Sequence, residues 1–246
     1  MGGHIATFRR YRGILAWNAL VNLHLGRHVM ESHRWFQEPP TALRDRLLGF
    51  SEEKQSLAGL LDAIYCYHGE CQEATFTRWG DKTPMNVGCM NGILDVFPEA
   101  RFIHLLRDGV DVVHSWSGVE KYTGEVVRPA RRWVHAIEAV REFRERHPQR
   151  MLEVRYENLC RKPEDELRRI CEFIDLPYDE AFVSRTEHYD EMNEAQSVAH
   201  YEKAFESIST DSIGKGRESM GPEQKREIAP LLDQELSRQG YSTVQV

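Results

Sequence analysis

The sequence predicts an α/β fold in three layers, with a central parallel sheet between helices. The mostly apolar run 102–106 has the length of a buried strand, and a helical pattern follows it after an Asp-Gly turn. Residues 151–156 are predicted to form a second strand. Strands that alternate with helices are joined by crossover connections, which make them parallel. The chain has 246 residues, 41% of them hydrophobic, so it can bury a sizeable core, and we expect a single domain over 1–246.

The amino-terminal part is predicted to be helical after one short strand. Residues 4–8 form the candidate strand, and 9–13 a basic loop. A helix is expected over 14–25, where apolar side chains recur on one face. These side chains are Ile14, Trp17, Val21 and Leu25. Further helices are predicted over 41–48, 51–68 and 85–97.

The remaining helices are predicted over 110–119, 129–147 and 163–174, and from Pro222 onward, where proline takes the first helical position. The helix over 129–147 is strongly basic, with seven arginines between Arg128 and Arg150. We interpret most of these arginines as a solvated face.

Composition excludes several classes of protein. The net charge of −7 and the isoelectric point near 5.9 argue against a general nucleic-acid binder. The five cysteines are odd in number and form no C-x-x-C pair, which favours reduced thiols and a cytoplasmic location. The histidines have no metal-ligand spacing, so no metal is expected. No apolar run is long enough to span a bilayer.

The most informative segment joins the first strand to the next helix. It places Arg107 at the carboxyl end of a buried strand and Ser115 two turns along the helix. Ligands of open α/β sheets bind at that edge. An arginine fork and a hydroxyl beside a helix N-terminus suit a phosphate monoester. A surface ion pair and an ordinary helical serine are equally compatible with this segment alone.

Three other segments carry side chains suited to the same chemistry. In Trp-Gly-Asp-Lys-Thr-Pro, Lys82 is a mobile cation in a loop that leads to a helix. Tyr156 ends the second strand, as a ligand contact or as a structural tyrosine. A Ser/Gly-rich loop over 207–219 holds Lys215 and Arg217, and could close over a phosphate or be only a surface loop.

Together and in this order, the four segments resemble the sulfotransferases that use 3′-phosphoadenosine-5′-phosphosulfate (PAPS), in the bacterial branch related to tyrosylprotein sulfotransferases. The resemblance covers about residues 79–224. It implies a P-loop NTPase-like fold, PAPS as co-substrate, 3′-phosphoadenosine-5′-phosphate (PAP) as product, and no metal. The acceptor would be a small molecule or a peptide, with no nucleic acid as partner.

The resemblance also implies a role for each matched residue. Arg107 and Ser115 would hold the 3′-phosphate of the donor, Tyr156 would line the nucleotide site, and Ser212 and Lys215 would cap it. Lys82 would stabilise the bridging oxygen as the sulfuryl group leaves.

The amino-terminal part matches the family in order and rough spacing. Gly13, with Arg12 before it, falls on the loop that cradles the 5′-phosphosulfate. Glu31 becomes the candidate general base, with His24 and His33 as alternatives. Residues 32–78 would form a helical cover over the acceptor site.

Two departures from the family pattern leave a second function open. Residues 11–15 lack the loop's hydroxyl side chains, so backbone N–H groups, with Arg9, Arg10 or Arg12, would have to bind the phosphosulfate. Two lost hydrogen bonds to a charged group lower affinity or rate by about a hundredfold to ten-thousandfold. Gly216 also stands where relatives often have a bulky residue. The alternative is therefore a nucleotide-binding homologue with little or no activity.

A third reading, an ATP-dependent kinase-like enzyme, finds no support in the sequence. The chain has no G-x-x-x-x-G-K-[ST], so the phosphate-binding lysine and the magnesium-binding hydroxyl are both missing.

Overall fold

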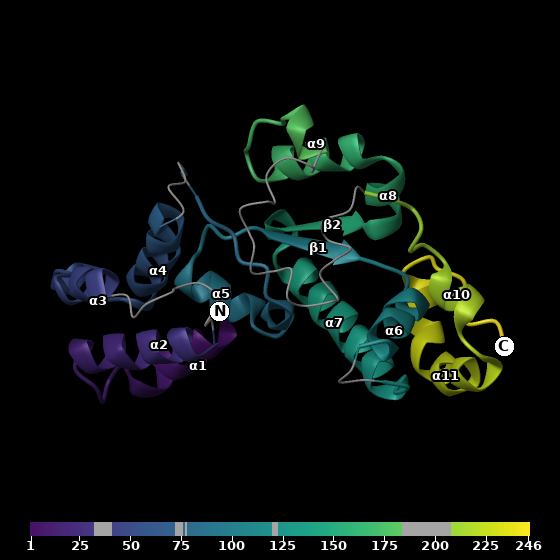
Figure 1. The fold of residues 1–246 in the computed structure, drawn as a ribbon, viewed down its shortest axis with the longest axis horizontal. Helices are drawn as coiled ribbons and strands as arrows, with labels where there is room; N and C mark the ends of the chain where they lie inside the picture. Colours follow the sequence, from purple (N-terminus) through teal and green to yellow (C-terminus); the bar gives the residue numbers. More distant parts are fainter. Residues whose placement is uncertain (32–40, 72–75, 77, 120–122, 184–207) are drawn as a thin grey trace. The chain divides into compact units, whose positions relative to one another are not determined.

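The computed structural model describes residues 1–31, 41–71, 76, 78–119, 123–183 and 208–246, with the backbone alone for 27–31 (Figure 1). The chain divides into two compact units, Met1–Ala100 and Arg101–Val246. The single domain over 1–246 stays a prediction.

In the described residues of the first unit, the regular elements are all helices, joined by turns and loops. Its elements are α1 (Gly2–Tyr11), α2 (Trp17–Glu31), α3 (Thr41–Leu48), η1 (Glu52–Lys54), α4 (Leu57–Cys71), η2 (Pro84–Gly88) and α5 (Met90–Val96). The helix over 41–48 is confirmed. The helices predicted over 51–68 and 85–97 each consist of a short 3₁₀ turn followed by an α-helix. Of the predicted cover over 32–78, the described parts are mainly helical, namely α3, η1 and α4.

The strand predicted over 4–8 is wrong, because these residues belong to α1. The buried side chains of α1 are His4, Ile5 and Phe8, a spacing that makes one face of a helix rather than the alternation of a strand. This face packs against α2, α4 and α5. The helix predicted from Ile14 begins only at Trp17, and Ile14 is 75% exposed.

The second unit contains both strands of the structure's sheet among the described residues. Its elements are β1 (Phe102–Leu106), α6 (Gly109–Ser117), α7 (Val127–Arg146), η4 (Pro148–Arg150), β2 (Met151–Arg155), α8 (Tyr156–Arg161), α9 (Pro163–Phe173), η5 (Glu180–Phe182), α10 (Lys215–Ser219) and α11 (Pro222–Arg238). The strands pair in parallel, with Phe102 opposite Met151 and Leu106 opposite Arg155. The predicted parallel α/β arrangement is therefore confirmed.

Helices cover the two strands on opposite sides (Figure 1). On one side, the Phe143 ring of α7 meets the Phe102 ring of β1 edge to face, with centroids 4.8 Å apart. On the other side, α8 and α9 pack against β2. A core of α6, α7 and α11 continues beside the sheet, where Val110, Ile137 and Leu232 are almost fully buried.

On the α7 side of the sheet, Glu153 of β2 is paired with two basic groups. Its carboxylate lies 3.3 Å from His104 Nδ1 and 3.2 Å from Arg144 Nη1. The hydrogen bond with His104, followed by Arg144, holds the pKa of Glu153 below its usual value of 4.5. A depressed carboxyl pKa stabilises the fold above the unfolded pKa, and this contribution is lost as the pH falls through the folded pKa.

We expect Glu153→Gln to be less stable than the wild type near neutral pH, with the difference shrinking as the pH falls below 4.5. Urea unfolding between pH 3 and pH 7 measures this difference. The control is Glu145→Gln, which removes an exposed carboxylate from α7 and should run parallel to the wild type. Parallel curves for Glu153→Gln would contradict the assignment.

Candidate functional site

The candidate site begins where the two parallel strands end. Arg107 directly follows β1 and Tyr156 directly follows β2, so the strand register places them side by side. The Arg107 guanidinium lies 4.6 Å from the centroid of the Tyr156 ring. Its Nη2 donates a 2.6 Å hydrogen bond to the carbonyl of Ser212. The structure thus brings together Arg107, Tyr156 and Ser212, three of the residues predicted to bind the donor.

The Arg107 side chain retains capacity for a further acceptor. It is 21% exposed, and its buried Nε has no hydrogen-bond partner among the described residues. A buried donor without a partner is unfavourable, so an incoming anion would satisfy it. Burial, followed by a hydrogen bond with Cys160, raises the pKa of Tyr156, which keeps its ring a neutral platform.

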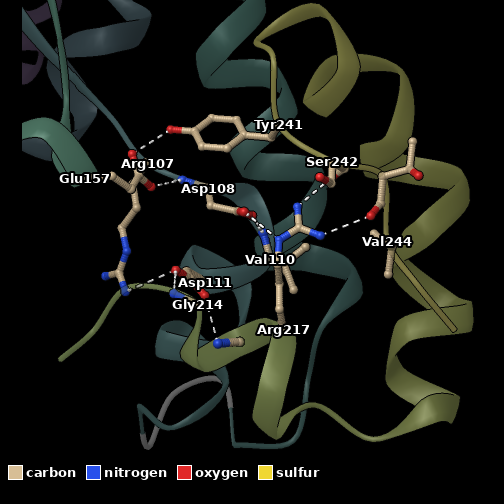
Figure 2. Close-up of polar contacts among 12 residues, drawn as sticks. Arg107, Asp108, Val110, Asp111, Glu157, Gly214, Arg217, Tyr241, Ser242 and Val244 are labelled. Carbon is tan, nitrogen blue, oxygen red and sulfur yellow. Dashed lines mark hydrogen bonds and ion pairs between the residues drawn. The ribbon is translucent and has the colours of Figure 1, made fainter. Parts of the chain in front are cut away.

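Hydrogen bonds to Arg107 and Asp108 fix the turn that follows β1 and orients the Arg107 side chain. Trp133 Nε1 donates to the Arg107 carbonyl at 3.1 Å. The Asp108 N–H donates to Glu157 Oε1 at 3.0 Å, and the Asp108 carboxylate caps α6 by accepting from the Val110 N–H at 2.8 Å (Figure 2). The two residues after Leu106 are therefore joined to the two residues after Arg155.

Hydrogen bonds join this turn to Arg217 and to the carboxy-terminal residues (Figure 2). Arg217 Nε donates to Asp108 at 2.7 Å, and its other nitrogens donate to the carbonyls of Ser242 and Thr243. Tyr241 donates to Glu157 Oε2 at 2.9 Å. Burial raises the pKa of Asp108 although Arg217 opposes this shift.

Ser115 and Lys215 are exposed side chains of the same unit. Ser115 lies on α6, one turn after Asp111, and Lys215 is the first residue of α10. Both are open to solvent, as the predicted contacts with a nucleotide require. Their roles stay predictions.

Close packing against the backbone of α6 explains why residue 216 is a glycine in this chain. A Cβ at this position would lie 2.5 Å from the Val110 carbonyl oxygen and 2.8 Å from the Asp111 Cα, which are backbone atoms that cannot move aside. We expect Gly216→Ala to destabilise the fold by about 1–3 kcal/mol in urea unfolding, since α10 must shift off α6. Gly118→Ala, where the nearest such contact is an ordinary 3.7 Å, should change stability much less. Equal stability of the two variants would contradict this packing.

In the first unit, the loop that carries Lys82 is held on both sides of the lysine. The Trp79 ring stacks on Tyr65 with centroids 4.1 Å apart, and its Nε1 donates to Asp62 at 2.9 Å. The Asp81 carboxylate accepts from Thr83 Oγ1 at 2.7 Å and from Asn86 at 2.8 Å. Lys82 itself is exposed, between two fixed residues.

The predicted phosphosulfate loop lies in a turn between two helices, with no strand before it. Arg12 and Gly13 are exposed in this turn. The N–H groups of Ile14 and Leu15 both donate to the Tyr11 carbonyl at 2.9 Å, so they are already used. The prediction that backbone N–H groups here cradle a phosphosulfate therefore finds no open donors at these two residues.

Two of the predicted bases, His24 and Glu31, belong to α2. Glu31 is the last residue of α2, and its side chain lies outside the described residues, as does the whole of His33. His24 is fully buried, and its Nδ1 lies 2.9 Å from Nδ1 of His4. His24 is thus part of the packing of α1 on α2, and its role as an alternative base stays a prediction.

The supporting residues of the site were not predicted, namely Asp111, Glu157, Arg217 as an anchor, and Tyr241. Asp111 could have been recognised from the sequence as a buried acid, because it lies within the apolar run Val110–Val113 of a predicted helix. Glu157 and Tyr241 join segments 84 residues apart, a pairing without a local signal.

Comparison with known proteins identifies the family. Residues 17–180 match the model of the sulfotransferase family. The chain belongs to the sulfotransferase family. The matched segment contains Lys82, Arg107, Ser115 and Tyr156, but neither the turn with Arg12 and Gly13 nor the loop with Ser212 and Lys215.

Relatives within the sulfotransferase family are named for different acceptors. The chain is 30% identical over 172 residues to a protein-tyrosine sulfotransferase of Drosophila melanogaster, covering 67% of this chain and 34% of that protein. It is 30% identical over 121 residues to the omega-hydroxy-beta-dihydromenaquinone-9 sulfotransferase Stf3 of Mycobacterium bovis, covering 44% and 31%. The chain thus spans about a third of the length of either protein.

Solved sulfotransferase structures share the fold. The sulfotransferase domain from the curacin biosynthetic pathway aligns with a TM-score of 0.58 at 18% identity, over 89% of this chain and 79% of that one. The sulfotransferase domain from the olefin synthase of Synechococcus PCC 7002 aligns with a TM-score of 0.55 at 20% identity, over 80% and 69%. The predicted sulfotransferase fold is confirmed.

Proposed function

We propose that this chain transfers the sulfuryl group of PAPS to an acceptor hydroxyl or amine. The observation that carries the proposal is the Arg107 guanidinium, stacked on Tyr156 at the ends of two parallel strands and holding a buried Nε without a partner among the described residues. A guanidinium offers a forked set of donors to a phosphate, and an aromatic ring beside it suits a nucleotide. The 3′-phosphate of PAPS is the group that this receptor would bind.

Sulfuryl transfer requires that the two reactants be held in position and that the charge developing on the leaving group be neutralised. The acceptor oxygen or nitrogen attacks sulfur, a new bond to sulfur forms, and the bond from sulfur to the bridging oxygen breaks. The electron pair of that bond stays on the 5′-phosphate, so PAP leaves. Lys82 would neutralise the charge that develops on the bridging oxygen, and Glu31 would take the acceptor's proton.

The acceptor class is proposed from the relatives. The names of the two relatives point to tyrosine in a protein and to a hydroxylated menaquinone. Both supply a hydroxyl group, so a hydroxyl acceptor on a peptide or small molecule is proposed first.

Among the described residues no helix could cross a membrane and no cluster of three potential ligands could hold a metal. The cytoplasmic location stays a prediction.

A second function is favoured by the turn over 11–15. The Ile14 and Leu15 N–H groups are occupied, and the residues have no hydroxyl side chain except that of Tyr11. These features favour a protein that binds the nucleotide through the Arg107 site without transferring sulfate.

Two measurements on the full chain separate the alternatives. Calorimetry with PAP tests donor binding, and turnover of ³⁵S-labelled PAPS over tyrosine peptides, phenols, alcohols and amines tests transfer. Binding together with labelled product supports the transferase. Binding without turnover across the panel supports the second function, and the absence of PAP binding contradicts both.

A further inference from the structure

We propose that Asp111 is a positioning residue for the 3′-phosphate of the donor, an inference that rests on the proposed function. Asp111 lies in the first turn of α6, and only 1% of its surface is exposed. Its Oδ2 accepts from the Gly214 N–H at 2.7 Å, and its Oδ1 accepts from the Gly216 N–H at 2.8 Å (Figure 2). One carboxylate thus fastens the segment that leads into α10.

The backbone around Gly214 and Gly216 has a conformation that lets it be held by Asp111. Gly214 has φ of +81°, a conformation that other residues rarely adopt, and Gly216 has no room for a side chain against the backbone of α6. The two glycine N–H groups can therefore reach the same carboxylate. Ser212 lies two residues before this attachment, and its carbonyl accepts from Arg107 Nη2.

Asp111 thereby determines where the Arg107 guanidinium is held. Its Oδ2 is 4.0 Å from Arg107 Nη2, and it fixes the backbone that contacts this nitrogen. Arg107 is consequently set by three neighbours before any ligand arrives: the Tyr156 ring, the Ser212 carbonyl and Asp111. A receptor arranged in advance loses less entropy when its ligand binds.

The effect of removing the Asp111 charge on PAP binding distinguishes a positioning role from a purely electrostatic one. A buried carboxylate 4 Å from the arginine opposes an incoming phosphate by its own negative charge. If charge decided the outcome, removing it would tighten the binding of PAP. If position decides, the loss of one acceptor weakens PAP binding, because the Asn side chain offers an NH₂ group where one glycine N–H needs an acceptor.

The test is Asp111→Asn, with PAP and adenosine 5′-phosphate titrated by calorimetry. These nucleotides differ only in the 3′-phosphate. We expect the variant to bind PAP on the order of tenfold more weakly and adenosine 5′-phosphate within about twofold of the wild type, so that the preference for PAP falls. The matched control is Asp211→Asn, which removes an exposed carboxylate from the same segment and should leave the preference unchanged.

Gly214→Ala provides a second route to the same outcome. It keeps Asp111 but strains the attached backbone, so it should also lower the preference for PAP. Equal or tighter PAP binding by Asp111→Asn, or an equal loss for both nucleotides, overturns the inference. Wild-type chain without any preference for PAP overturns the proposed function, and the inference with it.

Discussion

Replacing Arg107 by alanine should weaken the binding of PAP by about a hundredfold. At the joined strand ends, the guanidinium is positioned by stacking on Tyr156 and by a hydrogen bond to the Ser212 carbonyl. Each charged hydrogen bond to the phosphate contributes roughly 1.5–3 kcal/mol, and about 2.7 kcal/mol corresponds to a hundredfold change in Kd. Calorimetry with PAP measures the loss directly.

Two further variants make this result specific. Arg107→Lys keeps the charge but loses the fork, so its Kd should fall between those of the wild type and the alanine variant. Arg101→Ala removes an arginine from the other end of β1, about 20 Å along the strand, and should change the Kd less than twofold. A similar loss from both alanine variants would show that general charge, and not this site, governs binding.

Replacing Lys82 by alanine should lower kcat by about a hundredfold to a thousandfold. This is the usual effect of removing one group that stabilises charge developing in a transition state. The affinity for PAP should stay within about twofold, because Lys82 is assigned to the bridging oxygen and not to the 3′-phosphate. Steady-state kinetics with ³⁵S-labelled PAPS and the acceptor found in the panel measures kcat.

The matched control is Lys54→Ala, which removes another exposed lysine of the first unit from η1. It should have the wild-type kcat. If Lys82→Ala also keeps the wild-type kcat, the assigned role of Lys82 is wrong. If it loses PAP affinity instead, Lys82 binds the donor rather than acting on the leaving group.

Much of the second unit could be predicted because its signals are local. The apolar run over Phe102–Leu106 gave β1 at its observed bounds, and the strand ends placed Arg107 and Tyr156 at one edge. The turn after β1 followed from Asp-Gly, and the Asp108 side chain indeed caps α6. Patterns within ten residues were enough for these features.

The strand over 4–8 could not be distinguished from a helix by such a short pattern. His4, Ile5 and Phe8 are buried because α2, α4 and α5 surround α1, and this packing decides the conformation. The contacts of the two carboxylates that support the site, Asp108 and Asp111, could not be predicted from the sequence either. Asp111 reaches Gly214 across 103 residues, and Arg217 reaches Asp108 across 109, so only the folded chain shows these contacts.

A crystal structure of the chain with bound PAP shows directly whether Arg107 binds the 3′-phosphate. We predict that an oxygen of the 3′-phosphate lies within hydrogen-bond distance of the Arg107 guanidinium and of Ser115 Oγ, with the nucleotide against the Tyr156 ring. A 3′-phosphate bound elsewhere, with the Arg107 side chain still held against Tyr156, Ser212 and Asp111, would contradict the assignment of Arg107 to this phosphate.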